Sequence, residues 1–283
     1  MRPGSCSTSS TAILRPEPAP YTVNPLLDPD ARLVIAHRGA STEAPENTLP
    51  AFEAAVRRGA DAVELDVRLT ADGAPVVIHD ATLDRTTDRT GPVAAVTLAD
   101  LRSADAGRHF TPDLGRTHPY RGGDARIPTL GEVLWAFPGL HLLVEIKEPQ
   151  AQEAVRRVLL QEDAAERCVV ASEHREALLA FDEPPFARGA SAPEISSLYW
   201  AALLRRHPSA VSYRMLSVPL RHRGLTVPSR TFVAAARERG CAVHVWTVDV
   251  PDTARRLWRR GVSGIVTNVP GTMVEARRQE MGA

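Results

Sequence analysis

Short runs of apolar, mostly β-branched residues recur along the chain, separated by longer segments in which apolar positions return every three or four residues. Runs of the first kind are typical of buried strands, and segments of the second kind are typical of amphipathic helices. Strands are predicted at nine places: 32–36, 63–67, 75–78, 141–146, 167–171, 187–191, 213–218, 242–248 and 264–267. Regular alternation of strands and helices predicts an α/β fold with a parallel sheet.

The alternation favours a closed TIM (β/α)8 barrel over an open sheet, because no GxGxxG motif follows the first strand. Such a barrel has eight strands, so one of the nine candidates either is not a strand or lies outside the ring. The run at 187–191 is the weakest. The turn sequence at 71–74 leaves no room for a helix between the second and third candidates, which are therefore predicted to form a hairpin.

A long irregular segment at about 81–127 interrupts the alternation after the third strand. It is rich in Thr, Arg, Gly and Asp, and its one short helical candidate begins after Thr97. Long irregular segments inside a compact domain are usually functional. The segment is therefore interpreted as a small insertion over a site. Regular structure resumes at Thr129, which forms a capping-box pattern with Glu132.

The barrel domain is expected to span 31–275, between a flexible lead-in at 1–30 and a C-terminal tail at 276–283. The lead-in lacks the apolar core of a secretory signal, so a cytoplasmic location is expected. No apolar run reaches the roughly 18 residues that a transmembrane helix requires. The three cysteines, Cys6, Cys168 and Cys241, have neither CxxC spacing nor the pattern of a disulfide framework.

Charge is balanced, with 34 Lys and Arg residues against 34 Asp and Glu residues. General nucleic-acid binders and polybasic membrane binders need an excess of positive charge, so the balance argues against both classes. The basic clusters at 205–207 and 221–223 are interpreted as solvated faces, and contact with anionic lipid is the alternative. The expected partner is a small molecule, and the sequence carries no signal for an oligomeric state.

Two acidic residues, Glu64 and Asp66, stand two positions apart in an otherwise apolar run. Side chains alternate along a strand, so these two share one face. Neighbouring carboxylates in a partly buried site are costly unless a cation neutralises them or one of them takes up a proton. A divalent metal ion is the simplest explanation, and an edge strand with two solvated acids is the alternative.

Further polar residues follow neighbouring candidate strands, at the ends where barrel enzymes place their active sites. His37 and Arg38 follow the first strand, His79 follows the third, and Glu145 and Lys147 end the fourth. Three carboxylates suit one hard ion, Mg²⁺ or Ca²⁺, and the Arg and Lys side chains can bind phosphate oxygens. Two histidines can divide general base and general acid work. Together these residues indicate phosphoester cleavage.

Several motifs accompany these residues: IAHRGAS at 35–41, PENTLPAF at 45–52, ELDV at 64–67, the segments 73–80 and 83–87, IPTL at 127–130, EIK at 145–147 and VWTV at 245–248. Over about 33–270 the chain resembles the glycerophosphodiester phosphodiesterase family. The resemblance implies a TIM barrel with a small insertion after the third strand. It also implies hydrolysis of glycerophosphodiesters to glycerol 3-phosphate and an alcohol.

At the matching positions the resemblance implies a metal site, an acid/base pair and phosphate-binding groups, namely Glu64, Asp66 and Glu145 as ligands, His37 and His79 as the pair, and Arg38 and Lys147 on phosphate. The chain departs from the family pattern at SEH (172–174), GVSG (261–264) and TN (267–268), where Ser-Phe-Asp or Ser-Phe-Asn, Gly-Val-Asp-Gly and Thr-Asp are usual. These departures concern the far side of the pocket, and so the substrate more than the reaction.

Three further residues each have two interpretations. Trp246 stacks on the substrate or is a plain core residue, and Glu46 and Asn47 hydrogen-bond the metal ligands or cap the first helix. The same site would also serve a lysophospholipase D or a lyase that stops at a cyclic phosphate. A metal-stabilised phosphate-binding protein without turnover is an alternative of another class, although binding alone needs no proton carriers.

Overall fold

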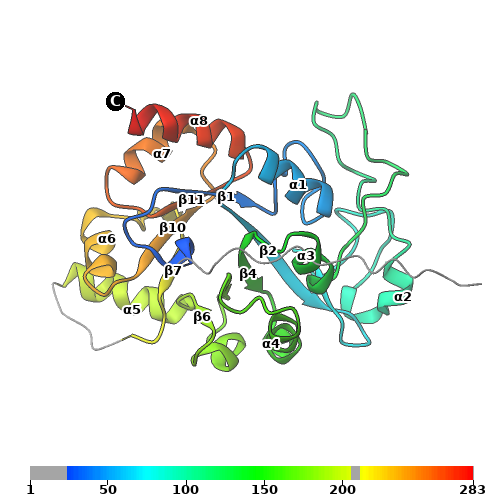
Figure 1. Ribbon diagram of the computed structural model, residues 1–283, viewed down its shortest axis with the longest axis horizontal. Helices are drawn as coiled ribbons and strands as arrows, with labels where there is room; N and C mark the ends of the chain where they lie inside the picture. The colour runs from blue at the N-terminus through cyan, green and yellow to red at the C-terminus, as the bar shows by residue number, and fades with distance from the viewer. Residues whose placement is uncertain (1–23, 205–210, 283) are drawn as a thin grey trace, which may run out of the picture.

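Eight parallel strands form a nearly closed barrel in the computed structural model of the protein, which describes residues 24–204 and 211–282 (Figure 1). Around the ring the strands are β6 (Ala187–Arg188), β5 (Cys168–Ala171), β4 (His141–Ile146), β2 (Ala62–Leu69), β1 (Leu33–His37), β11 (Gly264–Thr267), β10 (Ala242–Trp246) and β7 (Met215–Pro219). The amide of Ala190 donates to the carbonyl of Met215 at 2.8 Å and links the two end strands. The predicted TIM barrel is confirmed.

Helices follow the barrel strands and cover the outside of the ring. They are α1 (Leu49–Arg57), α3 (Leu130–Ala136), η3 (Pro149–Ala151), α4 (Gln152–Gln161), η4 (Arg175–Phe181), α5 (Ala192–Leu203), α6 (Arg230–Arg237), α7 (Pro251–Trp258) and α8 (Pro270–Met281). Each long helix packs an apolar face inward, as Phe52 of α1 and Phe232 of α6 do. Thr129 and Glu132 form the predicted capping box of α3. Within 24–204 and 211–282, no helix is long and apolar enough to cross a membrane.

One of the nine candidate strands, the third along the chain, lies outside the ring. β3 (Pro75–Val77) pairs with β2 in the antiparallel direction, as the predicted hairpin requires. Because β3 runs back toward the barrel, its end returns to the middle of β2, where the amide of Ile78 donates to the carbonyl of Asp66 at 3.0 Å. His79 therefore reaches the barrel rim from a returning hairpin, and the assumption that it ends one of the barrel strands is wrong.

The irregular segment after β3 forms a lobe at one side of the barrel (Figure 1). It contains η2 (Val93–Ala95) and α2 (Leu98–Leu101), and the side chain of Thr97 caps α2 as predicted. The lobe has a small apolar core of its own, which includes Leu83 and Leu101. This core explains how a segment with little regular structure keeps a defined shape beside the site.

Residues 24–30, assigned above to a flexible lead-in, close the amino-terminal end of the barrel. The short helix η1 (Pro25–Leu27) buries Leu26 completely among the interior side chains of the strands. The rest of the predicted lead-in, 1–23, lies outside the described residues. The predicted C-terminal tail begins inside α8, which continues to Met281 and buries Ala276.

His244 is a buried histidine inside the barrel, and we expect it to make stability depend on pH. Its Nε2 lies 2.8 Å from the carbonyl oxygen of Leu26. Burial lowers the pKa of His244 from 6.5 to about 4, so the unfolded chain binds a proton more readily than the folded protein does. The stabilisation is complete above the unfolded pKa and is lost as the pH falls toward the folded pKa. At about pH 5 the loss should be about 2 kcal/mol.

Urea unfolding at about pH 7 and about pH 5 measures this loss, with His244→Gln as the comparison. Glutamine keeps an N–H donor for the carbonyl of Leu26 but does not titrate, so the variant should lose less free energy of unfolding between the two conditions. Equal losses in the two proteins would contradict the assignment.

Candidate active site

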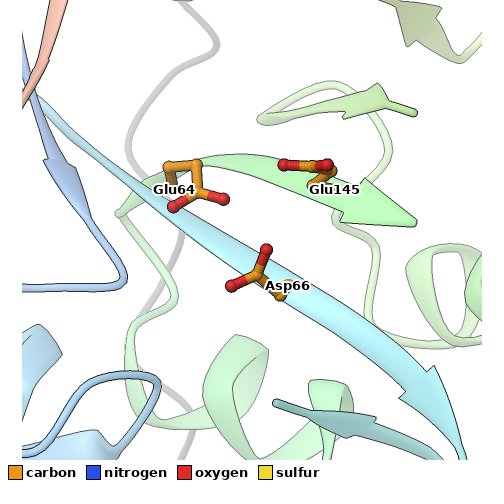
Figure 2. Close-up of side chains that lie close together, drawn as sticks. All are labelled: Glu64, Asp66 and Glu145. Atoms are coloured by element: carbon orange, nitrogen blue, oxygen red, sulfur yellow. The ribbon is translucent and has the colours of Figure 1, made fainter. Parts of the chain in front are cut away.

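Three carboxyl groups meet at the C-terminal rim of the barrel on two neighbouring strands. Glu64 and Asp66 alternate along β2, and Glu145 stands opposite Asp66 in the register of β4. One oxygen of each residue lies within 4.8 Å of the others. Figure 2 shows the three carboxyl groups turned toward a common space. We refer to these three residues as the carboxylate cluster, which could hold a metal ion.

Burial makes three negative charges costly at this place. Burial raises the pKa of Glu64 well above its usual value, and the carboxylates of Asp66 and Glu145 raise it further. Burial likewise raises the pKa of Glu145. Burial also acts to raise the pKa of Asp66, but the positive charges of Lys147 and Arg38 have the larger effect and lower it. Further positive charge beside the cluster would therefore favour its fully ionised form.

The two cationic residues predicted to bind phosphate lie against the carboxylate cluster. Nζ of Lys147 is 2.8 Å from Oδ1 of Asp66 and 2.7 Å from Oε1 of Glu145. Nε of Arg38 is 3.1 Å from Oδ2 of Asp66. Three carboxylates within 4.8 Å of one another supply only oxygen ligands, which is the donor set that a hard divalent ion prefers.

The loop after β1 holds two of the carboxylates in place. The amide of Arg38 donates to Oε2 of Glu64 at 3.0 Å, and Nδ2 of Asn47 donates to Oδ2 of Asp66 at 2.8 Å. Arg38 and Asn47 both have left-handed backbones, with φ angles of 56° and 59°. Of the two roles predicted for Asn47, the hydrogen bond to the cluster is present, whereas Thr48 occupies the N-cap of α1.

The carboxylate of Glu46 contacts two cationic side chains, and Thr48 occupies the N-cap of α1. Its carboxylate accepts from Arg38 at 2.9 Å and from Arg85 of the insertion at 2.7 Å. Arg85 also donates to Asp80 at 2.6 Å and so holds the pKa of Asp80 well below its usual value. The other oxygen of Asp80 lies 2.6 Å from Nδ1 of His79. A chain of alternating charges thus connects His79 and the insertion to Arg38.

His37 ends β1 beside Glu64, its partner in the strand register. Nδ1 of His37 lies 2.8 Å from Oδ1 of Asn268, and its Nε2 lies 4.0 Å from Oε2 of Glu64. Nδ2 of Asn268 donates to Oδ2 of Asp249 at 2.8 Å, which fixes the amide with its oxygen toward His37. An amide oxygen only accepts, so Nδ1 of His37 carries the proton and Nε2 offers a lone pair. Burial and the charge of Arg38 lower the pKa of His37.

The motifs in the sequence do not mark Asn268 or Asp249 as site residues. In the sequence, Asn268 stands out only because the family usually has Asp at this position, and no motif includes Asp249. Both follow strands, β11 and β10, that lie next to each other in the ring. Only this neighbourhood brings the two side chains together behind His37.

The side of the rim away from His37 is formed by β5, β6 and β7, with β4 and β10 on either side of them. Trp246 ends β10 and is 37% exposed, so it is not a plain core residue. Oγ of Ser172 donates to the carbonyl of Ile146 at 2.7 Å and accepts from the amide of His174 at 3.2 Å, and so ties the ends of two strands together. Glu173 and Trp246 line a cavity that opens beside the carboxylate cluster.

The fold and the site together define a class of protein. A parallel barrel carries three carboxylates, two cationic side chains and a tautomerically defined histidine at its C-terminal rim, where barrel enzymes have their active sites. This is the arrangement of a barrel enzyme that acts on phosphate esters.

The chain belongs to the glycerophosphoryl diester phosphodiesterase family, which residues 37–272 match. It is 34% identical over 254 residues to a glycerophosphodiester phosphodiesterase of Caldanaerobacter subterraneus subsp. tengcongensis, covering 87% of this chain and 98% of the relative. It is 31% identical over 265 residues to a glycerophosphodiester phosphodiesterase of Bacillus subtilis, covering 87% and 86%.

Solved structures of other proteins are similar as well. A phosphodiesterase of Oleispira antarctica, in complex with the product sn-glycerol-3-phosphate, is 28% identical with a TM-score of 0.68, covering 87% of this chain and 96% of that one. The glycerophosphoryl diester phosphodiesterase domain of an uncharacterized Mycobacterium tuberculosis protein has a TM-score of 0.78 at 24% identity, covering 88% and 99%, and supports the fold. The protein is thus an enzyme, a phosphodiesterase of this family.

Proposed function

We propose that the protein hydrolyses glycerophosphodiesters to glycerol 3-phosphate and an alcohol, with one divalent metal ion. The observation that carries the proposal is the carboxylate cluster, with its oxygens within 4.8 Å of one another beside His37. The relative from Oleispira antarctica was solved with sn-glycerol-3-phosphate, and we extend that product to this chain.

Glu64, Asp66 and Glu145 are the residues that would hold the ion, either Mg²⁺ or Ca²⁺, since both prefer oxygen ligands. When bound, such an ion draws charge from the phosphate and removes the cost of three neighbouring carboxylates. Lys147 neutralises part of the cluster in the structure. With that charge supplied by the ion, Lys147 and Arg38 would bind the phosphate oxygens, Arg38 being held by Glu46.

The two histidines would carry the protons. We assign His37 as the general base, because Nδ1 faces the amide oxygen of Asn268 and leaves the lone pair of Nε2 toward the cluster. It would take the proton of the attacking hydroxyl, which belongs to water or to the glycerol of the substrate. His79 would give a proton to the leaving alcohol, and the carboxylate of Asp80 at 2.6 Å would balance the positive charge of its ring.

Turnover of glycerophosphocholine followed by ³¹P NMR tests the proposal. We expect glycerol 3-phosphate as the product when Mg²⁺ or Ca²⁺ is present, loss of activity with EDTA, and recovery when excess metal is added. Accumulation of a cyclic phosphate would instead identify a lyase. Full activity in excess chelator would reject the metal site, and absence of any product with either metal would reject the function.

A further inference from the structure

A cavity of about 440 Å³ extends from the carboxylate cluster toward the surface, on the side of the rim away from His37. Glu145 lies at its inner end, and the ends of the barrel strands form its floor, including Ala171 and Trp246. Helix α5 forms one wall. The hairpin of β8 (Arg221–His222) and β9 (Leu225–Thr226) forms another. The cavity is thus continuous with the place proposed for the phosphate and has the size of a ligand site.

The walls of this cavity are mainly apolar. Ala190, Ile195, Tyr199, Pro219 and Val227 line it together with the residues of the floor. The acidic residues of the lining are Glu145 and Glu173, and the cationic residue is Arg223 between the two strands of the hairpin. A small polar head group would be held near the acids and would leave most of the apolar wall in water.

Exposed apolar side chains continue the cavity wall onto the surface. Trp200 of α5 and Leu225 of β9 line the cavity and are 55% and 52% exposed. Leu203 and Leu204 follow Trp200 at the three- and four-residue spacing of one helix face, and both are exposed. Contiguous exposed apolar residues of this kind are typical of a binding surface.

We propose that this cavity binds the hydrocarbon chain of an amphiphilic phosphodiester, with the phosphate at the carboxylate cluster and the chain running out between α5 and the β8–β9 hairpin. The proposal rests on the proposed function and names the substrate class of that site. A chain that begins beside the phosphate fits a channel with mainly apolar walls. The chain could be joined to the glycerol, as in a lysophospholipid, or to the leaving alcohol.

Binding of n-alkylphosphocholines of increasing chain length, each below its micelle-forming concentration, tests the cavity without turnover. Calorimetry should show affinity rising about fourfold per added methylene until the channel is filled, because each methylene leaves water. Affinity that does not change with chain length would overturn the proposal. Because binding alone is measured, this result does not depend on whether the protein cleaves any diester.

Variants of Trp200 and Leu225, which line the cavity where it reaches the surface, test the proposal during turnover. In Trp200→Ala and Leu225→Ser, the ratio of kcat/KM for 1-lauroyl-glycerophosphocholine to that for glycerophosphocholine should fall about tenfold relative to the unaltered protein. Trp135→Ala and Leu179→Ser, which remove side chains that are 58% and 57% exposed elsewhere on the surface, serve as matched controls and should leave the ratio unchanged. Glycerophosphododecanol, with the chain on the leaving alcohol, shows which ester carries the chain.

The outcomes separate this proposal from the proposed function. Cleavage of glycerophosphocholine together with chain-independent affinity rejects only the apolar channel. Chain-dependent affinity without cleavage of any diester rejects only the phosphodiesterase reaction. An equal loss for both substrates in the Trp200 and Leu225 variants would show that the cavity holds the head group and would overturn the assignment to a hydrocarbon chain.

Discussion

Replacing Asp66 with asparagine should lower kcat/KM for glycerophosphocholine by about 10³-fold, or roughly 4 kcal/mol of transition-state stabilisation. Asp66 is fully buried at the centre of the carboxylate cluster and contacts Lys147, Arg38 and Asn47. The amide oxygen that the substitution introduces can still accept from Asn47, so the fold should persist. The variant loses the negative charge on which both a divalent ion and the two cations depend.

Affinity for Mg²⁺ and Ca²⁺, measured by calorimetry on the same variant, separates loss of metal binding from loss of chemistry. We expect the affinity to fall together with the activity, and Glu145→Gln to act in the same direction. Asp72→Asn, on the exposed turn between β2 and β3, is the matched control and should behave like the unaltered protein. Normal metal affinity and normal turnover in Asp66→Asn would show that the cluster is not the metal site.

Removing the imidazole of His37 should lower kcat by about 10³-fold with little change in KM, as expected for loss of a general base. The exposed His109 of the insertion provides the control, since His109→Ala removes an imidazole from the surface. Turnover that stays near normal in His37→Ala, with metal present, would contradict the assignment.

Variants of Asn268 and Asp249 test whether these two residues keep the proton of His37 on Nδ1. Asn268→Asp would set two carboxylates against each other where Nδ2 now donates to Asp249 at 2.8 Å, and we expect about a tenfold loss of kcat. The exchange Asn268→Asp/Asp249→Asn restores a donor between the two and an acceptor for Nδ1 of His37, so most of the activity should return. Ring ¹⁵N shifts should report the Nδ1–H tautomer in the unaltered protein and in the exchange variant, and the other tautomer in neither.

Local sequence rules correctly predicted those parts of the molecule that depend on near neighbours. The two-residue period placed Glu64 with Asp66, and the turn at 71–74 predicted the β2–β3 hairpin. The capping pattern at Thr129 predicted the start of α3. These signals are reliable because the face of a strand, a tight turn and a helix N-terminus are each decided within a few residues.

The sequence by itself therefore determined the barrel class, the family and the residue types of the site, and the tertiary structure decided how those residues act on one another. Parallel pairing of β4 with β2 brings Glu145 to Asp66 and places Lys147 between their carboxylates. The antiparallel return of β3 delivers His79, and neighbouring strand ends bring Asn268 to His37. The apolar channel likewise exists only where α5 faces the β8–β9 hairpin. Strand register and helix packing depend on contacts between residues far apart in the chain, and no local spacing encodes them.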